Sequence, residues 1–228
     1  MLNFCNRDNK NKDIEFDLDN FVSSIKNCGE DGLVIDNCNT ATTIIINYIN
    51  NKFAIETISC KKRNYNKLDF LSVYLTLSKK LEEKYEFIAK ENKFKINDIP
   101  IQLNAWRINR IFNNFFNIND NNILSVDKGK ENINNSYLYP MNFIMCDGAN
   151  HSQFAAISKG NGESFFKGMY DFSKLYDLCR FDGCNFIDND NKIIELSDDH
   201  VSEEILFAGI IFEVGRIRLD EGFENPYA

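Results

Sequence analysis

Apolar residues recur at helical spacing near the start of the chain. Phe21 and Ile25 lie four residues apart, which predicts a short helix over 17–27. A second helix is expected over 40–53. The residues at 42–46 are all β-branched, however, and such side chains fit a strand as well as a helix. This second segment therefore keeps two interpretations.

The most regular apolar stripe follows, and it predicts one long helix over about 67–93, with Asn66 as its N-cap. The stripe consists of Phe70, Tyr74, Leu77, Leu81, Tyr85 and Ile88. Pro100 opens the next segment, where a further helix would place Arg107 and Arg110 on one face.

Beyond residue 137 the pattern changes to short apolar runs separated by turn-forming residues. The expected elements are a strand at 141–146, a turn at 147–149, a helix at 150–158, a strand at 164–169, a short helix ending at 178, a hairpin of 181–187 and 192–196, and a helix at 201–214. We therefore predict an α+β fold in which a helical N-terminal half packs on a small mixed sheet formed mainly by the C-terminal half. One domain is expected over 1–228, with a helical part at 16–116 and a mixed α/β part at 137–228.

Charge narrows the range of partners. The net charge of −8 argues against broad binding of nucleic acid, which requires cations to neutralise phosphates. The charge is uneven, because residues 61–110 carry a net +6 and residues 181–228 a net −9. Such an uneven distribution of charge fits a steering field, a self-complementary contact or simply solvated faces. The short basic runs at 61–63 and 93–95 fit solvated loops better than a nucleic-acid site.

Cysteine usage and hydropathy point to a cytoplasmic setting. The seven cysteines are odd in number and form no Cys-x-x-Cys pair, which favours reduced thiols over disulfides or structural zinc. The N-terminal residues lack the apolar core of a secretory signal, and no run reaches the roughly 18 apolar residues that span a bilayer. We expect no membrane partner.

The strongest chemical signal is the turn between an apolar strand and a helix at Asp147-Gly148-Ala149-Asn150-His151-Ser152. A helix N-terminus presents unpaired N–H groups and the positive end of the helix dipole, which favour a phosphate or carboxylate. Asp147, Gly148, Asn150 and Ser152 are candidate ligand-binding residues. His151 is the catalytic candidate because an imidazole can shuttle protons. The alternative is an ordinary helix start in which Asn150 or Ser152 is the N-cap and His151 is a packed or exposed imidazole.

The same turn resembles the phosphate-contacting turn of the ParB/sulfiredoxin-like fold, which reads Gly-x-x-His-Arg before an alanine-containing helix. Gly148 and His151 match the glycine and histidine, whereas Ser152 stands where that family has arginine. The resemblance implies a bound nucleotide or other phosphorylated ligand, with hydrolysis as a further possibility. Arg107 or Arg110 would then supply the missing cation. The turn is also similar to the Asn-His-Ser turns of small uncharacterised bacterial proteins.

Two acidic segments invite a metal hypothesis. His200 and Glu204 would share a helix face, although acidic residues are also typical of an ordinary first helical turn. The run at 188–191 lacks the glycine and glutamate of a calcium loop and is expected to be a plain turn. No metal site is therefore predicted, and the sequence leaves the cofactor unknown.

Two classes of function remain open. The first is a domain that binds a nucleotide or another small phosphorylated ligand at 147–152. The second is a protein–protein interaction or regulatory subunit, with a role in bacterial defence as one setting. The second class is favoured by the uneven charge, by the 20 phenylalanines and by the lack of a complete catalytic motif.

Overall fold

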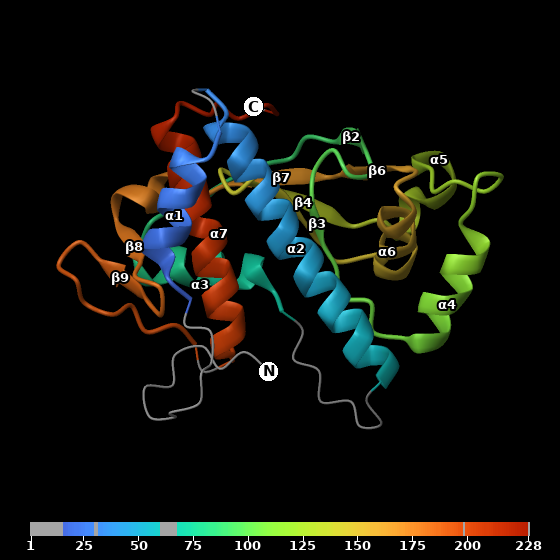
Figure 1. The fold of residues 1–228 in the computed structure, drawn as a ribbon, viewed down its shortest axis with the longest axis horizontal. Helices are drawn as coiled ribbons and strands as arrows, with labels where there is room; N and C mark the ends of the chain where they lie inside the picture. The colour runs from blue at the N-terminus through green and yellow to red at the C-terminus, as the bar shows by residue number, and fades with distance from the viewer. Residues whose placement is uncertain (1–15, 30–31, 60–67, 198, 228) are drawn as a thin grey trace.

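The computed structural model describes residues 16–29, 32–59, 68–197 and 199–227 (Figure 1). The helices are α1 (Leu18–Asn27), α2 (Val34–Ser59), α3 (Phe70–Lys80), α4 (Ile108–Asn117), α5 (Val126–Gly129), α6 (Asn150–Lys159) and α7 (Ser202–Asp220), with 3-10 turns η1 (Lys130–Asn132) and η2 (Ser173–Asp177). None of the helices in these ranges has both the length and the apolar character needed to cross a membrane.

The main sheet has five strands in the order β1-β7-β4-β5-β3. Its strands are β1 (Glu86–Ile88), β3 (Ile101–Gln102), β4 (Asn135–Tyr139), β5 (Phe143–Cys146) and β7 (Gly168–Asp171). The β3–β5 and β4–β7 pairs are parallel and the other pairs antiparallel, so the sheet is mixed. Two smaller pairs join β2 (Asn92–Lys95) to β6 (Glu163–Phe166), and β8 (Cys179–Phe181) to β9 (Phe186–Asp188). The predicted α+β class is confirmed, whereas the single domain stays a prediction.

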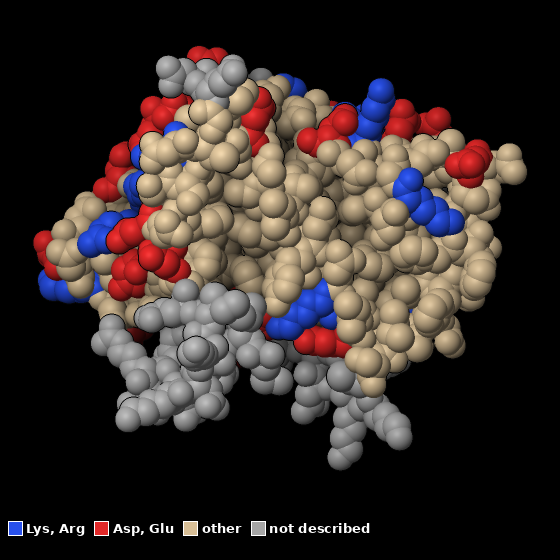
Figure 2. Space-filling model, viewed as in Figure 1, with Lys and Arg blue, Asp and Glu red and all other residues tan. Residues whose placement is uncertain are grey.

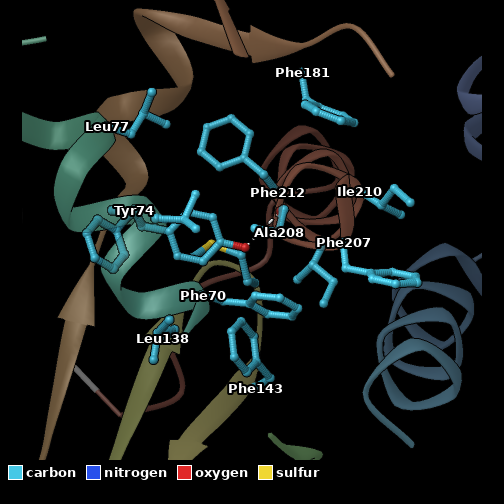
Figure 3. Packing of buried hydrophobic residues seen from close by; sticks show 14 of the residues in the cluster. Phe70, Tyr74, Leu77, Leu138, Phe143, Phe181, Phe207, Ala208, Ile210 and Phe212 are labelled. Carbon is cyan, nitrogen blue, oxygen red and sulfur yellow. Dashed lines mark hydrogen bonds between the residues drawn. The ribbon is translucent and has the colours of Figure 1, made fainter. Parts of the chain in front are cut away.

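Both faces of the main sheet are buried. Along β5, Phe143 and Met145 join one apolar cluster, while Ile144 and Cys146 join a second cluster on the opposite face. The first cluster includes the buried residues of α7, and this helix packs against α1, α2 and α3. Figure 3 looks along α7, with aromatic side chains of α3 and of the sheet directed at it. The Tyr74 hydroxyl donates to the Ala208 carbonyl at 2.8 Å, which fixes α3 against α7.

The ambiguous second segment is a helix, and α2 is longer than expected at 26 residues. Thr42 and Thr43 donate their hydroxyls to the carbonyls of Cys38 and Asn39, four residues back, at 2.9 and 2.8 Å. These bonds satisfy the hydroxyls inside the helix. Burial of one face of α2 against α7 outweighs the strand preference of its β-branched residues.

The long helix predicted for 67–93 is wrong in its second half. α3 ends at Lys80, and Glu82 adopts a left-handed conformation with φ of 53°. Beyond this turn the chain forms β1, and the ring of Tyr85, the residue just before this strand, packs 5.4 Å from that of Tyr170. The apolar residues after Lys80 therefore pack through the pairing of β1 with β7 and not through a helix. Asp69 is the N-cap of α3, while Asn66 and the basic run 61–63 lie outside the described residues.

Three other boundaries differ from expectation. After Pro100 the chain first forms β3, and α4 begins only at Ile108. The strand expected at 164–169 is divided between β6 and β7, which belong to different sheets. The hairpin turns at 182–185, and the run at 188–191 forms a second turn closed by a bridge between Ile187 and Ile193. α6 and η2 lie close to their predicted positions, whereas α7 extends to Asp220, beyond its predicted end at 214, and β4 was not predicted.

Candidate functional site

The turn between β5 and α6 has the predicted strand–turn–helix geometry. Ala149 is left-handed, with φ of 55° and ψ of 25°, and α6 begins at Asn150. A side chain at Gly148 would overlap the carbonyl oxygen of Asn132, so the protein's own backbone occupies the space that this glycine leaves. The Asp147 N–H donates to the Asn134 carbonyl at 2.7 Å. The turn is thus held against the segment 132–134.

A buried polar network supports the turn from beneath. The Asn135 amide donates to Gln153 Oε1 and to Ser164 Oγ, both at 3.0 Å. Gln153 Nε2 in turn donates to Asn135 Oδ1 and to the Gly148 carbonyl, each at 3.1 Å. The side chains of Asn135, Gln153 and Ser164 are buried, and satisfied networks of this kind make a local structure rigid.

His151 lies inside the protein, with 6% of its surface exposed. Its Nε2 atom accepts the backbone N–H of Arg107 at 3.0 Å, and its ring packs against Trp106 at 6.0 Å between centroids. Burial, followed by the positive charges of Arg110 and Arg107, lowers the pKa of His151 to about 4. The ring is therefore neutral at pH 7 and acts as an acceptor that holds the residues before α4.

The other polar residues at the start of α6 also have partners within the protein. Asn150 Oδ1 accepts the N–H of Asn104 at 2.8 Å, and Ser152 Oγ donates to Asn114 Oδ1 at 2.9 Å. Together with His151, these side chains attach the first turn of α6 to α4 and to the loop before it.

A hollow of about 240 Å³ lies beside the first turn of α6. Its walls come from α4, the 122–133 segment and the start of α6, through Asn114, Asn117, Ile118, Asn122, Ile123, Leu124, Ser125, Asn132, Ile133, Ala149 and Ser152. These lining residues carry amide, hydroxyl and apolar groups and no charge. Ser152 and Ala149 are the residues of the 147–152 turn that line the hollow, whereas His151 does not.

Arg107 and Arg110 are exposed at the start of α4. The Arg107 guanidinium lies 4.0 Å from the centre of the Trp106 ring, a stacked cation–π geometry. Both arginines lie close enough to His151 to lower its pKa, although neither lines the hollow. The structure thus brings the two predicted arginines near the predicted turn.

The side chains of His200 and Glu204 also lie in contact. His200 precedes α7, and Glu204 lies in its first turn. His200 Nδ1 lies 2.8 Å from Glu204 Oε2, and its Nε2 lies 3.3 Å from the Thr76 hydroxyl of α3. The second Glu204 oxygen accepts the Asp69 N–H. Within the described ranges, no group of three or more His, Cys, Asp or Glu side chains is arranged to hold a metal ion. We interpret this cluster as a link between α3 and α7.

An exposed aromatic surface on α4 was missed from the sequence. Phe112 and Phe116 project from one face of α4 with 47% and 79% of their surface exposed, and Trp106, 41% exposed, lies just before the helix. The four-residue spacing of Phe112 and Phe116, with asparagines around them, was the available signal. Exposed aromatic groups of this size are typical of contact surfaces.

These features define an α+β protein with a rigid strand–turn–helix junction beside a small uncharged hollow. The chain belongs to a family of unknown function, DUF6710, whose model matches residues 5–225. The family match shows no link to the ParB/sulfiredoxin-like fold. No curated protein and no solved structure matches the chain.

Proposed function

We propose that this protein binds a small phosphorylated ligand, of the size of a nucleotide or smaller, in the hollow beside the first turn of α6. The observation that carries the proposal is the position of Ala149 and Ser152 in the wall of that hollow. The first backbone N–H groups of a helix have no acceptor within the helix, and they lie at the positive end of its dipole. A phosphate oxygen is a natural acceptor there.

The neighbouring groups favour the same class of ligand. The amide side chains of Asn114, Asn117, Asn122 and Asn132 offer both donors and acceptors to a sugar or a base. Burial is the main cause of the lowered pKa of His151, and the positive charges of Arg110 and Arg107 lower it further. The same positive charges attract an anion. Because His151 is neutral, buried and already paired, the proposal assigns it a positioning role and no part in hydrolysis.

Calorimetric titration and thermal unfolding with inorganic phosphate, AMP and ATP, each with and without Mg²⁺, test the proposal. The wild-type protein should bind one of these probes and unfold at a higher temperature in its presence. Ser152→Glu, which adds a negative charge to the wall, should abolish that shift. Asn109→Glu, an exposed position of α4 outside the hollow, should preserve it. A wild-type protein that none of the probes stabilises contradicts the proposal.

The exposed aromatic surface on α4 supports a second candidate, an interaction or regulatory subunit. Phe112 and Phe116 would contact apolar side chains, while Arg107 and Arg110 beside them would contact acidic ones. The partner expected is a protein segment that carries both kinds of side chain.

A photo-crosslinking amino acid at position 116 in the source cell tests this candidate. A single protein adduct should form there. Irradiation of an extract of the same cells at raised salt should give less of this adduct, because salt screens the exposed arginine contacts that hold the partner before crosslinking. The same amino acid at Phe87, which is 50% exposed on the sheet edge, is the matched control and should give no such adduct. Equal adducts at both positions count against the α4 surface.

A further inference from the structure

A second pocket, the α2–β3 pocket, has a volume of about 170 Å³ and lies between α2, β3 and the last turn of α6 (Figure 1). It shares no lining residue with the hollow beside the first turn of α6. Its apolar lining residues are Ile99, Pro100, Ile101 and Ile157. An apolar cavity of about 150 Å³ holds a molecule of the size of benzene. The α2–β3 pocket therefore has room for one six-membered ring.

Hydrogen bonds fix the walls of this pocket relative to one another. Asn50 of α2 joins this helix to the β3 segment, because its Nδ2 atom donates to the Ile101 carbonyl and its Oδ1 atom accepts the Leu103 N–H, both at 2.8 Å. The Pro100 carbonyl accepts the N–H of Ile144 in β5 at 2.9 Å. The space is thus formed by the fold itself, as is usual for small-molecule sites.

Three polar side chains complete the lining: Thr43 and Asn47, which lie four residues apart on one face of α2, and Asn97 in the turn before β3. The Thr43 hydroxyl donates to the Asn39 carbonyl at 2.8 Å, so its oxygen can still accept a hydrogen bond. In the part of the chain that the structure describes, neither the Asn47 nor the Asn97 amide has a hydrogen-bond partner. Both amides are therefore available to a ligand.

The charges around the pocket favour a neutral ligand. None of the lining residues is charged. α2 crosses the front of the molecule in Figure 1, and the same region of Figure 2 shows a broad uncharged band with charges toward its edges. Ile157 lies in the last turn of α6, where the negative end of the helix dipole disfavours an anion. The pocket thus differs from the hollow at the other end of α6, where the dipole favours a phosphate.

We propose that the α2–β3 pocket binds a neutral six-membered ring with an amide-like edge, of the kind that a pyrimidine base such as uracil presents. An asparagine side chain places a donor beside an acceptor, and so does the ring N–H of uracil beside its carbonyl, so the two form a pair of hydrogen bonds. The faces of the ring contact the apolar walls. This site is independent of the proposed phosphate site.

Titration of the full chain with uracil, followed by NMR, tests the proposal. The side-chain amide signals of Asn47 and Asn97 should shift and reach saturation. Dimethyluracil has the same ring, but methyl groups replace both N–H donors, so it should bind at least about tenfold more weakly. Uridine identifies the source of the ring, because binding of uracil alone indicates a free base and binding of both indicates a nucleoside. A wild-type protein whose amide signals do not shift overturns the proposal.

Substitutions on α2 test the location of the site. Asn47→Leu keeps the size of the side chain and removes its amide, so it should weaken uracil binding by about tenfold. Asn51→Leu, the same change at an exposed position of α2 outside the pocket, is the matched control and should leave binding unchanged. Ser152→Glu should also leave it unchanged, which separates this site from the phosphate site. Thermal unfolding verifies that each variant is folded. Uracil binding that survives Asn47→Leu, or dimethyluracil that binds as tightly as uracil, overturns the proposal.

Discussion

The contacts of His151 come from residues that lie far from it in the sequence. The sequence indicates a histidine at the start of a helix, which fits a proton shuttle, a packed ring or an exposed ring. The Nε2 atom accepts an N–H from the residue before α4, and Trp106 covers the ring. Which role applies depends on residues 44 positions away in the chain, and local spacing carries no information about them.

The pH dependence of stability follows from this burial. The pKa of His151 is lowered from 6.5 to about 4, so the unfolded chain takes up a proton between these values that the folded protein does not. The corresponding stability is fully present above pH 6.5 and is lost as the pH falls toward 4. The loss is on the order of 3 kcal/mol at most.

Urea unfolding of the wild type and of His151→Gln across this range measures the effect. Glutamine can still accept the Arg107 N–H but does not titrate. The free energy of unfolding of the wild type should fall more steeply with decreasing pH than that of the variant. Parallel pH profiles for the two proteins would argue against a buried, neutral imidazole.

At the scale of elements, helices and strands were predicted correctly where the local sequence pattern and the tertiary contacts favour the same structure. The strand, turn and helix around 147–152 were placed closely because an apolar run, a glycine and a helical pattern follow one another. The helix over 67–93 failed beyond Lys80 because Tyr85 and Ile88 keep helical spacing with Tyr74 and Leu77, although Ile88 belongs to the edge strand β1 and Tyr85 lies just before it. A spacing of three and four residues does not distinguish a helix from a helix followed by a strand.

At the β5–α6 junction, substitutions at the adjacent positions Gly148 and Ala149 should affect the stability of the protein differently. Gly148→Ala places a methyl group on the Asn132 carbonyl and should destabilise the protein by about 1–3 kcal/mol. Ala149→Gly relieves a left-handed conformation that alanine rarely adopts, and its cost should be small or its effect stabilising. Urea midpoints of both variants provide the comparison. A tolerated Gly148→Ala would mean that the 132–134 segment moves away readily.

At the scale of the whole molecule, the fold class was predictable from the sequence, but the assembly of the sheet was not. Short strands from residues 86–102 complete a sheet whose centre comes from residues 135–171, and two edge strands of two or three residues leave little trace in a sequence. The hollow beside α6 could not be predicted from the sequence either, because its walls come from three separate segments.

The position of α7 in the chain has a consequence for synthesis. α7 is the last of the described helices, yet α1, α2 and α3 all pack against it. While the protein is being made, these three helices leave the ribosome long before residues 202–220 follow. Their apolar faces must stay exposed or bind a chaperone in the meantime. We therefore expect nascent chains that stall before residue 202 to be captured by chaperones or degraded, because the element that joins the first helices is still missing.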